Sequence, residues 1–248
     1  MTSGGRPRAG LDFRLHLVQR APVFRSVDSQ AIADLVQLAR ERRVARRESF
    51  FLQGDPATDV FVLCAGRLKA TQLASAGEQV ILRLVGPGET FGALEVGAGG
   101  QYSSGAEALE ASHALLWERS DFDAIADRNP VILRNVLRIL SERMRSLEQS
   151  CRELATVRAA ERVAAALVRL AGQMGRPLDG GALVALGRED LAQLTGCTPF
   201  TVSRLFADWE SRGYLRSRRE AVVLLDAAGL TRYVAAAPRR AASGSAAE

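Results

Sequence analysis

REDLAQLTGCTPFTVSRLFADWESRGYL, residues 188–215, predicts two short helices joined by a tight turn. Gly196 can adopt the positive φ that ends a helix, and Gly213 can end the second helix in the same way. Thr198 is a favourable N-cap residue, and Pro199 suits the first position of the helix that follows. The residues that helix boundaries require therefore stand at each boundary of this stretch.

The second helix of this stretch has two distinct faces. Its apolar residues recur at i, i+3, i+4 and i+7, which predicts a buried face made of Val202, Leu205, Phe206 and Trp209. The opposite face presents Phe200, Ser203 and Arg204. Two helices with a glycine-containing turn are typical of the helix-turn-helix, whose second helix enters the DNA major groove. The alternative is a helical hairpin within a core, but side chains suited to base edges favour DNA binding.

Composition limits the class of protein. The chain has 248 residues, enough for two domains, and its 47% hydrophobic content can build real cores. No apolar run approaches the roughly 20 residues of a membrane span, and the N-terminus lacks a signal-peptide core, so we expect a cytoplasmic protein without membrane contact. The net charge of +5 suits a polyanionic partner.

Neither a metal site nor an active site is predicted. The three cysteines, Cys64, Cys151 and Cys197, are far apart and lack CxxC spacing, which disfavours a disulfide scaffold, a zinc site and an iron–sulfur cluster. With only two histidines, no catalytic triad, carboxylate pair or metal-ligand spacing stands out. We therefore expect a protein that is not an enzyme.

The N-terminal half predicts a small all-β domain. Residues 1–20 form an N-terminal segment whose first ten residues are expected to be disordered, and residues 28–42 predict an amphipathic helix. From Val44 on, short apolar segments alternate with glycine turns, which is typical of a β-roll or barrel over residues 21–124. The strands are expected at residues 49–52, 60–64, 67–72, 80–85, 106–108 and 114–118. The run GPGETFG, residues 86–92, lacks the helix and the Lys-Ser/Thr of a phosphate loop, so we interpret its glycines as turn residues.

A long helix follows and is opened by Asn129-Pro130 within residues 125–156. Steps of four and three residues define a coiled-coil seam, whose members are Leu133, Leu137, Leu140, Met144, Leu147, Cys151 and Leu154. The simplest partner is a second copy of the chain, which gives a parallel homodimer; the alternative is a helix packed only within its own subunit. Ile132, Val136 and Ile139 form a second apolar set that can pack on the β-roll.

The DNA-binding domain is expected at residues 157–235. It contains a helix at 161–171, a short strand at 182–186, the helix-turn-helix and a short helix at 230–234. Strands at 214–216 and 222–225 flank a basic tip with Arg218 and Arg219, which indicates a wing whose arginines contact phosphates. Residues 236–248 are predicted to be a disordered tail.

This order of parts resembles the Crp/Fnr superfamily of bacterial transcription regulators over about residues 20–235. The matching stretches are VFVLCAGRLKA (60–70), LVGPGETFGAL (84–94), the Asn-Pro that opens the long helix, and residues 188–215 with their TVSR and RGYL segments. The resemblance implies an α+β fold: an N-terminal double-stranded β-roll (a jelly roll like that of cyclic-nucleotide-binding domains), a long dimerisation helix and a C-terminal winged helix-turn-helix.

The resemblance also implies a mechanism. A signal at the β-roll or at the junction of the roll and the long helix shifts the dimer helices, so that the two winged helices reach the spacing of successive major grooves in an inverted repeat. The DNA-bound homodimer then contacts RNA polymerase or blocks it. The alternative is a β-roll module that controls a partner protein without sequence-specific DNA binding, which would need neither residues 188–215 nor a basic wing.

The residues that meet DNA are implied position by position. Arg204 matches the base-reading arginine of the family, and its guanidinium suits guanine O6 and N7. Ser203 is its neighbour and can contact a base edge or methyl group. Thr198, Thr201 and Arg188 match phosphate-contacting positions, and Pro199 opens the helix that carries the readers.

Phe200 departs from the family. Many members have a glutamate at this position, which can accept a hydrogen bond from cytosine N4. Phenylalanine cannot, so we expect it to contact a thymine methyl group. Half-sites with a TTG- or TG-like step are therefore expected.

The expected effector pocket comprises Gly92, Ala93, Leu94, Ser103 and Ser104. In members that bind cyclic AMP, a glutamate in this region holds the ribose hydroxyl and an arginine holds the phosphate. Ala93 cannot accept a hydrogen bond from its side chain, and Ser103 carries no charge. The usual mode of cyclic AMP binding is therefore disfavoured.

Other signals stay open, and the effector is left unassigned. The positions that would contact a purine fall near Leu147 and Glu148 rather than on a Thr-Ser pair. The oxygen-sensing branch holds an iron–sulfur cluster with N-terminal cysteines, and none precedes Cys64. Haem is an alternative that needs an axial ligand such as His16 or His113, but an ordinary surface or half-buried histidine is the default interpretation of both.

Two cysteines allow redox alternatives. Cys151 lies in the seam and can pair with its copy across a dimer, and Cys197 lies in the helix-turn-helix turn, where oxidation would interfere with DNA binding. Packing as small apolar side chains is the default interpretation of both.

Overall fold

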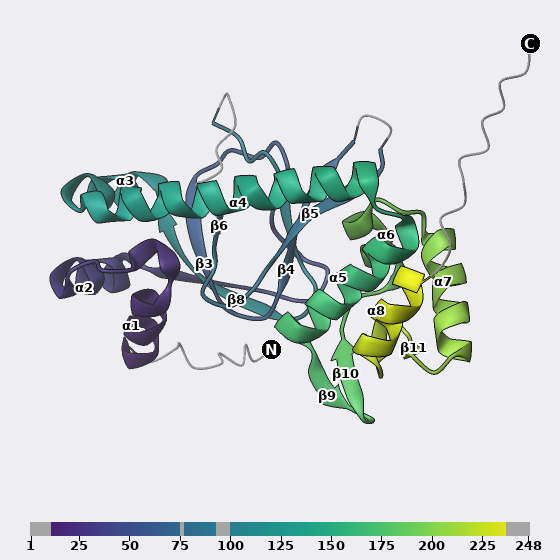
Figure 1. Ribbon diagram of the computed structural model, residues 1–248. Coiled ribbons are helices and arrows are strands. Elements are labelled where there is room, and N and C mark those ends of the chain that lie inside the picture. The colour runs from purple at the N-terminus through teal and green to yellow at the C-terminus, as the bar shows by residue number, and fades with distance from the viewer. Residues whose placement is uncertain (1–10, 75–76, 93–99, 237–248) are drawn as a thin grey trace, which may run out of the picture. The chain divides into compact units, whose positions relative to one another are not determined.

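The computed structural model describes residues 11–74, 77–92 and 100–236 (Figure 1). The chain divides into two compact units, residues 1–150 and residues 151–248. Most of the two predicted disordered segments, residues 1–10 and 237–248, lies outside the described residues.

The first unit contains the predicted β-roll, which is confirmed as two antiparallel four-stranded sheets. One sheet has the order β1 (Arg40–Val44), β8 (Ser112–Glu118), β3 (Asp59–Ala65) and β6 (Thr90–Gly92). The other has the order β2 (Ser49–Phe51), β7 (Gly105–Ala108), β4 (Leu68–Leu73) and β5 (Gln79–Val85). Phe50 of β2 packs edge-on against Phe61 of β3 and Phe91 of β6, with ring centroids 5.6 and 5.3 Å apart, so aromatic contacts join the two sheets.

The helix predicted at residues 28–42 is confirmed up to Leu38, and only its last four residues are wrong. Helix α2 spans Ser29–Leu38, and the side chain of Asp28 caps it by accepting hydrogen bonds from the amides of Gln30 and Ala31. The next residues form β1, which pairs with β8 from Arg40↔Leu116 to Val44↔Ser112. Because β1 is an edge strand, its arginines can point into solvent, and charged side chains are common on such edges.

Strand β6 was not predicted, because its residues were interpreted only as a turn. Gly92 explains why the strand carries a glycine. Its φ is +94°, and an added Cβ would lie 2.7 Å from the carbonyl oxygen of Asp59 and from a ring carbon of Phe61. The close approach of β6 to β3 therefore requires a residue without a side chain at this position.

Short helices and the long helix cover the roll. They are α1 (Leu11–Arg20), the 3₁₀ turn η1 (Pro22–Phe24), α3 (Arg119–Arg128) and α4 (Pro130–Thr156). Asn135 of α4 is buried, and its amide nitrogen donates hydrogen bonds to the carbonyls of Val23 (3.1 Å) and Arg25 (2.7 Å). Ile132 is fully buried, and Val136 and Ile139 pack against the same core, so the second apolar set is confirmed.

The second unit is a winged helix. Its elements are α5 (Ala159–Met174), β9 (Arg176–Leu178), β10 (Gly181–Val184), α6 (Arg188–Thr195), α7 (Pro199–Ser211), β11 (Leu215–Arg218), β12 (Ala221–Leu224) and α8 (Ala227–Ala236). The strands form one sheet in the order β11-β12-β10-β9. Strand β9 lies in a segment that was predicted to be only a turn-rich link.

A charged cluster joins α1 to the edge of the roll. Arg14 of α1 lies 2.6 Å from one carboxylate oxygen of Glu41, while His113 and Arg43 lie 3.3 and 3.5 Å from the other. Burial acts to raise the pKa of Glu41, but the hydrogen bond and charge of Arg14, with the charges of His113 and Arg43, outweigh it and lower that pKa. Burial lowers the pKa of His113, and the nearby Glu41 only partly offsets this.

We predict that the thermal stability of the protein falls as the pH is lowered from 7 to 4. Folding favours neutral His113, so stability decreases below the ordinary histidine pKa of 6.5. Folding also favours ionised Glu41, so its contribution is present above the ordinary glutamate pKa of 4.5 and is lost as the pH falls through the lowered value. Thermal melts followed by circular dichroism should show that His113→Asn flattens mainly the upper part of this profile, since the charge of His113 is only one of several that lower the pKa of Glu41. The exposed His16→Asn is the matched control, and equal profiles for both variants would contradict the assignment.

Candidate nucleic-acid interface and effector pocket

The helix-turn-helix begins and ends at the predicted residues. Asp190 accepts a hydrogen bond from the amide of Gly187 at the start of α6, and the hydroxyl of Thr198 accepts one from the amide of Thr201 at the start of α7 (3.1 Å). Pro199 occupies the first turn of α7. Gly196 ends α6 with a φ of +60°, and an added Cβ would lie 2.5 Å from the side chain of Leu154. Two independent constraints therefore keep glycine in the turn.

Helix α7 buries one face and exposes the other. Val202, Phe206 and Trp209 are buried and Leu205 is half-buried, as the spacing predicted. Phe200, in contrast, is 75% exposed at the start of the helix. Its ring is therefore accessible to a partner molecule.

The predicted contact residues surround the start of α7. Arg204 is exposed and forms no ion pair or hydrogen bond with any other described residue. Thr198, the N-cap residue of α7, is also exposed, while Thr201 and Ser203 are half-buried. Arg188, at the start of α6, is exposed, and its guanidinium lies 5.8 Å from the centre of the Phe206 ring. These placements leave Arg204 available for a base.

The wing is present, but its arginines differ from one another. Strands β11 and β12 pair from Leu215↔Leu224 to Arg218↔Ala221, so Arg219 and Glu220 form the tip. Arg219 is exposed and unpaired within the described chain. Arg218, in contrast, forms an ion pair with Asp179.

Asp179 was missed from the sequence. It lies between β9 and β10 in left-handed backbone with a φ of +50°, and it pairs with Arg218 and lies 3.6 Å from Arg216. The Asp-Gly-Gly run at 179–181 was the available signal, since such runs mark tight turns between strands. The hairpin therefore places an acidic group against two basic residues of the wing.

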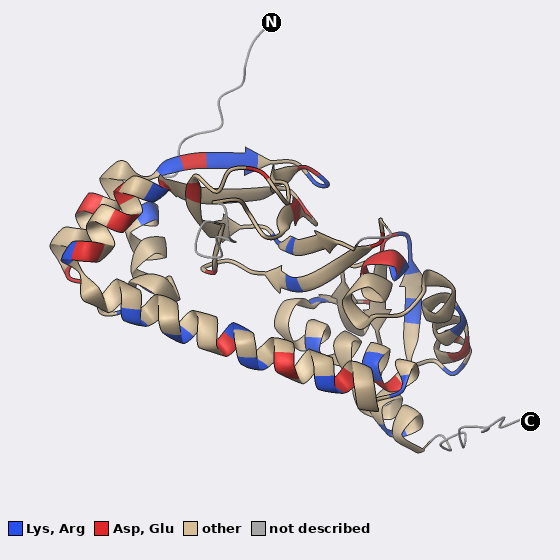
Figure 2. Ribbon diagram, turned by 90° about the horizontal axis from the view of Figure 1, so that it is seen from above, with Lys and Arg blue, Asp and Glu red and all other residues tan. Residues whose placement is uncertain are grey.

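The seam of α4 is accessible along its length. In Figure 2 the positions of basic (blue) and acidic (red) residues alternate along the ribbon of this helix. Leu133, Leu137, Met144, Leu147 and Leu154 are 47–65% exposed, Leu140 is half-buried and Cys151 is exposed. Within the described chain these residues form an apolar stripe, and the dimer that it suggests stays a prediction.

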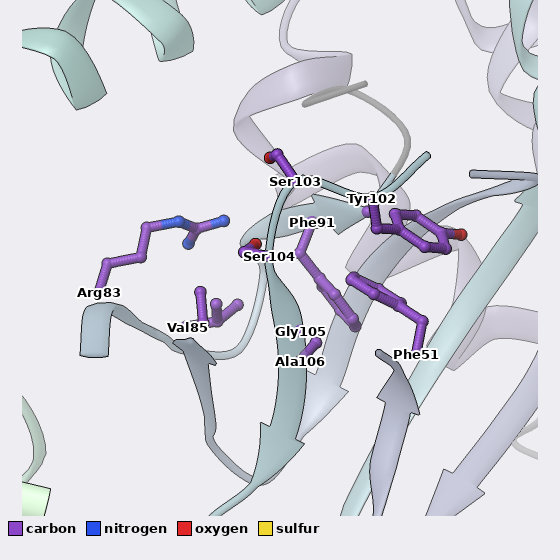
Figure 3. A pocket seen from close by; sticks show the side chains of 11 residues that line it. Phe51, Arg83, Val85, Phe91, Tyr102, Ser103, Ser104, Gly105 and Ala106 are labelled. Atoms are coloured by element: carbon purple, nitrogen blue, oxygen red, sulfur yellow. The ribbon is translucent and has the colours of Figure 1, made fainter. Parts of the chain in front are cut away.

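The expected effector pocket is nearly filled by aromatic side chains. Gly92, Ser103 and Ser104 lie around a cavity of about 10 Å³, which has room for about one water molecule (Figure 3). The rings of Phe51 and Tyr102 stack there with centroids 3.7 Å apart. Ala93 and Leu94 lie outside the described residues. This small cavity cannot hold a nucleotide, but Ser103 also lines a larger groove of about 950 Å³ between β4, β5 and α4.

Comparison with known proteins agrees with both units. Residues 41–129 match the model of the cyclic nucleotide-binding domain, and residues 161–233 match that of the Crp-like helix-turn-helix domain. The chain is 30% identical over 220 residues to a CRP-like cAMP-activated global transcriptional regulator of Mycobacterium tuberculosis, and the match covers 87% of this chain and 97% of that protein. This chain belongs to the Crp/Fnr family of transcription regulators.

Solved structures of the family share the fold. A CRP-family transcriptional regulator from Thermus thermophilus is 28% identical, with a TM-score of 0.68 over 79% of this chain and 97% of that one. FixK2 from Bradyrhizobium japonicum is 25% identical, with a TM-score of 0.67 over 78% of this chain and 96% of that one. The Crp/Fnr fold predicted from the sequence is thus confirmed, with its roll, long helix and DNA-binding helix-turn-helix.

Membrane spans and metal sites are absent from the described part of this Crp/Fnr chain. No helix in residues 11–74, 77–92 and 100–236 combines the length and apolar character needed to cross a bilayer. In the same residues no group of histidine, cysteine and acidic side chains is arranged to hold a metal ion.

We predict that Asp179→Asn strengthens DNA binding without changing which sequence is preferred. Releasing Arg216 and Arg218 from the carboxylate makes them available to phosphates, which carry no sequence information. The slope of log K against log salt concentration should steepen by about one or more, in proportion to the phosphates gained. Fluorescence anisotropy with specific and random duplexes measures both quantities. Asp34→Asn in α2 changes the charge equally, and an identical effect there would contradict the role of Asp179.

Proposed function

We propose that this Crp/Fnr regulator binds an inverted-repeat DNA site as a homodimer, with its activity set by a signal at the β-roll. The observation that carries the proposal is the start of α7, where Arg204, unpaired within the described chain, and the 75% exposed Phe200 stand on a correctly capped helix-turn-helix. The guanidinium of Arg204 can donate two hydrogen bonds to a guanine, and the exposed ring of Phe200 can contact the methyl group of a neighbouring thymine.

The proposed roles separate base reading from positioning. Arg204 reads guanine, Phe200 contacts a thymine methyl, and Ser203 contacts a neighbouring base edge, which favours half-sites with a TTG- or TG-like step. The positioning contacts to phosphate come from Arg188, Thr198, Thr201, Arg218 and Arg219, with Pro199 fixing the start of the helix. Because Arg218 already pairs with Asp179, Arg219 is the stronger phosphate contact of the wing.

The seam of α4 is the proposed dimer contact. One recognition helix reads only a few base pairs, so a unique site needs a second copy, and a two-fold dimer matches an inverted repeat. The exposed leucines of α4 are spaced for such a contact. The DNA-bound dimer then recruits or blocks RNA polymerase, as family membership suggests.

Cyclic AMP in the usual mode is not the proposed signal, although the mycobacterial relative is described as cAMP-activated. Phe51, Phe91 and Tyr102 fill the space beside Ser103 and Ser104, and neither serine supplies a positive charge. The usual contacts to the cyclic phosphate are therefore missing at Ser103 and Ser104.

We predict that Arg204→Ala reduces discrimination between the best site and random DNA. Loss of a bidentate contact to guanine costs about 1–3 kcal/mol per half-site, and random DNA loses less because it offers phosphate contacts only. Gel shifts at rising salt with genomic fragments measure the ratio. Arg232→Ala, which removes an exposed arginine of α8, should leave the ratio unchanged. An unchanged ratio for Arg204→Ala would refute the base-reading role, and no preference among fragments in the wild type would favour a β-roll module that controls a partner protein.

We predict that Leu137→Glu produces a monomer. Leu137 is 65% exposed in the single chain, so the substitution leaves the fold of each unit intact, but it places two carboxylates opposite each other in the seam. Sedimentation velocity at micromolar concentration should show loss of the dimer, together with loss of the preference for inverted repeats over single half-sites. Arg134→Ala, at an exposed position outside the seam, should remain dimeric. A Leu137→Glu protein that still sediments as a dimer would place the interface elsewhere.

A further inference from the structure

The first turn of α7 presents an apolar surface to its DNA partner. Phe200 is 75% exposed, and Pro199 beside it is exposed as well. The other aromatic residues of the helix, Phe206 and Trp209, are buried with their ring centroids 6.2 Å apart. Phe200 is thus the aromatic side chain that α7 offers to a base.

The hydroxyl groups at this turn already bind each other. Thr198 Oγ1 accepts a hydrogen bond from the amide of Thr201 at 3.1 Å and lies 3.0 Å from Thr201 Oγ1. One hydroxyl hydrogen of the pair is used in this contact, and the other can be donated to a phosphate oxygen. The pair is therefore suited to the DNA backbone, while the base edge faces Phe200.

The carboxylates of α7 lie in its later turns and have partners of their own. Asp208 lies 2.8 Å from the guanidinium of Arg212 and accepts a hydrogen bond from the hydroxyl of Tyr233 at 2.9 Å. Glu210 accepts a hydrogen bond from the amide of Ser217 at 2.8 Å. The first turn therefore offers no carboxylate to the amino group of a base, and apolar contact is what remains.

The apolar group that a base edge shows in the major groove is a methyl group on C5 of a pyrimidine. Thymine carries this methyl group, and 5-methylcytosine carries it on the same atom. Phe200 and Arg204 are four residues apart on α7, so their side chains lie on one face and can meet neighbouring bases. A CG step with a methylated cytosine therefore offers these two side chains the same methyl group and the same guanine as a TG step.

We propose that the protein recognises C5-methylated cytosine in its DNA site, and that Phe200 reads the methyl group. This deepens the proposed function and rests on it, because it names a chemical state of DNA that the recognition helix distinguishes. An unmethylated cytosine places only a C–H group opposite the ring, so apolar burial and dispersion contacts are lost. Methylation of a CG step thereby converts a poor half-site into a good one, while Arg204 binds the guanine in both.

The test compares synthetic duplexes built on the preferred inverted repeat from the gel shifts. They carry thymine, uracil, cytosine or 5-methylcytosine beside the guanine, so that thymine and uracil, and likewise the two cytosines, differ by one methyl group. Burial of one such group corresponds to roughly a fourfold gain in affinity per half-site. Fluorescence anisotropy at fixed salt should give about this ratio in both pairs. Equal affinities within either pair would overturn the proposal, and so would a preferred site without a pyrimidine beside the guanine.

Variants assign the methyl contact to one side chain. Phe200→Ala should bring both ratios close to one, and the fold should be retained because the ring is 75% exposed. Phe200→Leu keeps an apolar side chain and should keep most of both ratios. Phe200→Glu should instead favour cytosine over thymine, because a carboxylate can accept from cytosine N4. Phe13→Ala removes a 47% exposed phenylalanine of α1 and is the control. Retention of both ratios in a normally folded Phe200→Ala would refute the assignment.

The same duplexes separate this proposal from the proposed function. The preference for inverted repeats over single half-sites is measured with thymine in every half-site, and the methyl ratios are measured on both kinds of duplex. A wild-type protein that prefers inverted repeats but ignores the methyl group would refute methyl reading alone. Equal binding of every duplex, random sequence included, would refute both.

Discussion

The buried amide of Asn135 fixes the start of the long helix. Its two hydrogen bonds to the carbonyls of Val23 and Arg25 tie α4 to the turn that closes the N-terminal helices over the roll, and the fully buried Ile132 packs one turn earlier. A buried amide that lost these partners would be costly, so the rotation of the helix about its own axis is defined. That rotation decides which stripe of α4 packs on the roll and which faces outward. Both the groove and the exposed seam follow from it.

Aromatic side chains fill the interior of the roll. The rings of Phe51 and Tyr102 stack beside Ser103 and Ser104, and the edge-on contact of Phe50 with Phe61 joins the two sheets. The larger space in this unit lies where β5 and α4 face each other. A domain can thus match the cyclic nucleotide-binding model over residues 41–129 and offer a different set of contacts. Family membership shows the fold, whereas the side chains within that fold determine which ligand it can bind.

Sequence reasoning succeeded where the signal was local. The capping of α7 by Thr198, the positive φ of Gly196 and the buried stripe of Val202, Phe206 and Trp209 are all properties of a few adjacent residues, and the structure confirms them. The roll as a class was also predictable, because strands and glycine turns alternate over a long stretch.

Sequence reasoning failed where a strand or an ion pair depends on a residue that is distant in the chain. Strand β1 is rich in arginine and follows a helix directly, and only its pairing with β8, about seventy residues later, makes it a strand. Strand β6 depends in the same way on close packing against β3. The contact of Asp179 with Arg218 joins two hairpins, and the carbonyl of Thr90 accepts hydrogen bonds from both Arg83 of β5 and Arg143 of α4. None of these pairs is adjacent in sequence, so no window of residues reveals them. The DNA-contact and dimer residues stay predictions, since no DNA and no second chain is present.

The pairing of Asp179 with the wing has a consequence for how the protein would search a chromosome. A regulator meets a vast excess of unrelated DNA, and its affinity for that DNA comes from phosphate contacts alone. If the wing contacts phosphates as proposed, an aspartate that already neutralises part of it lowers this affinity and leaves the proposed base contacts at α7 untouched. A smaller fraction of the protein is then bound to non-specific DNA, and each non-specific complex dissociates sooner. An acidic residue in a basic domain thus favours rapid sampling of sites over tight retention.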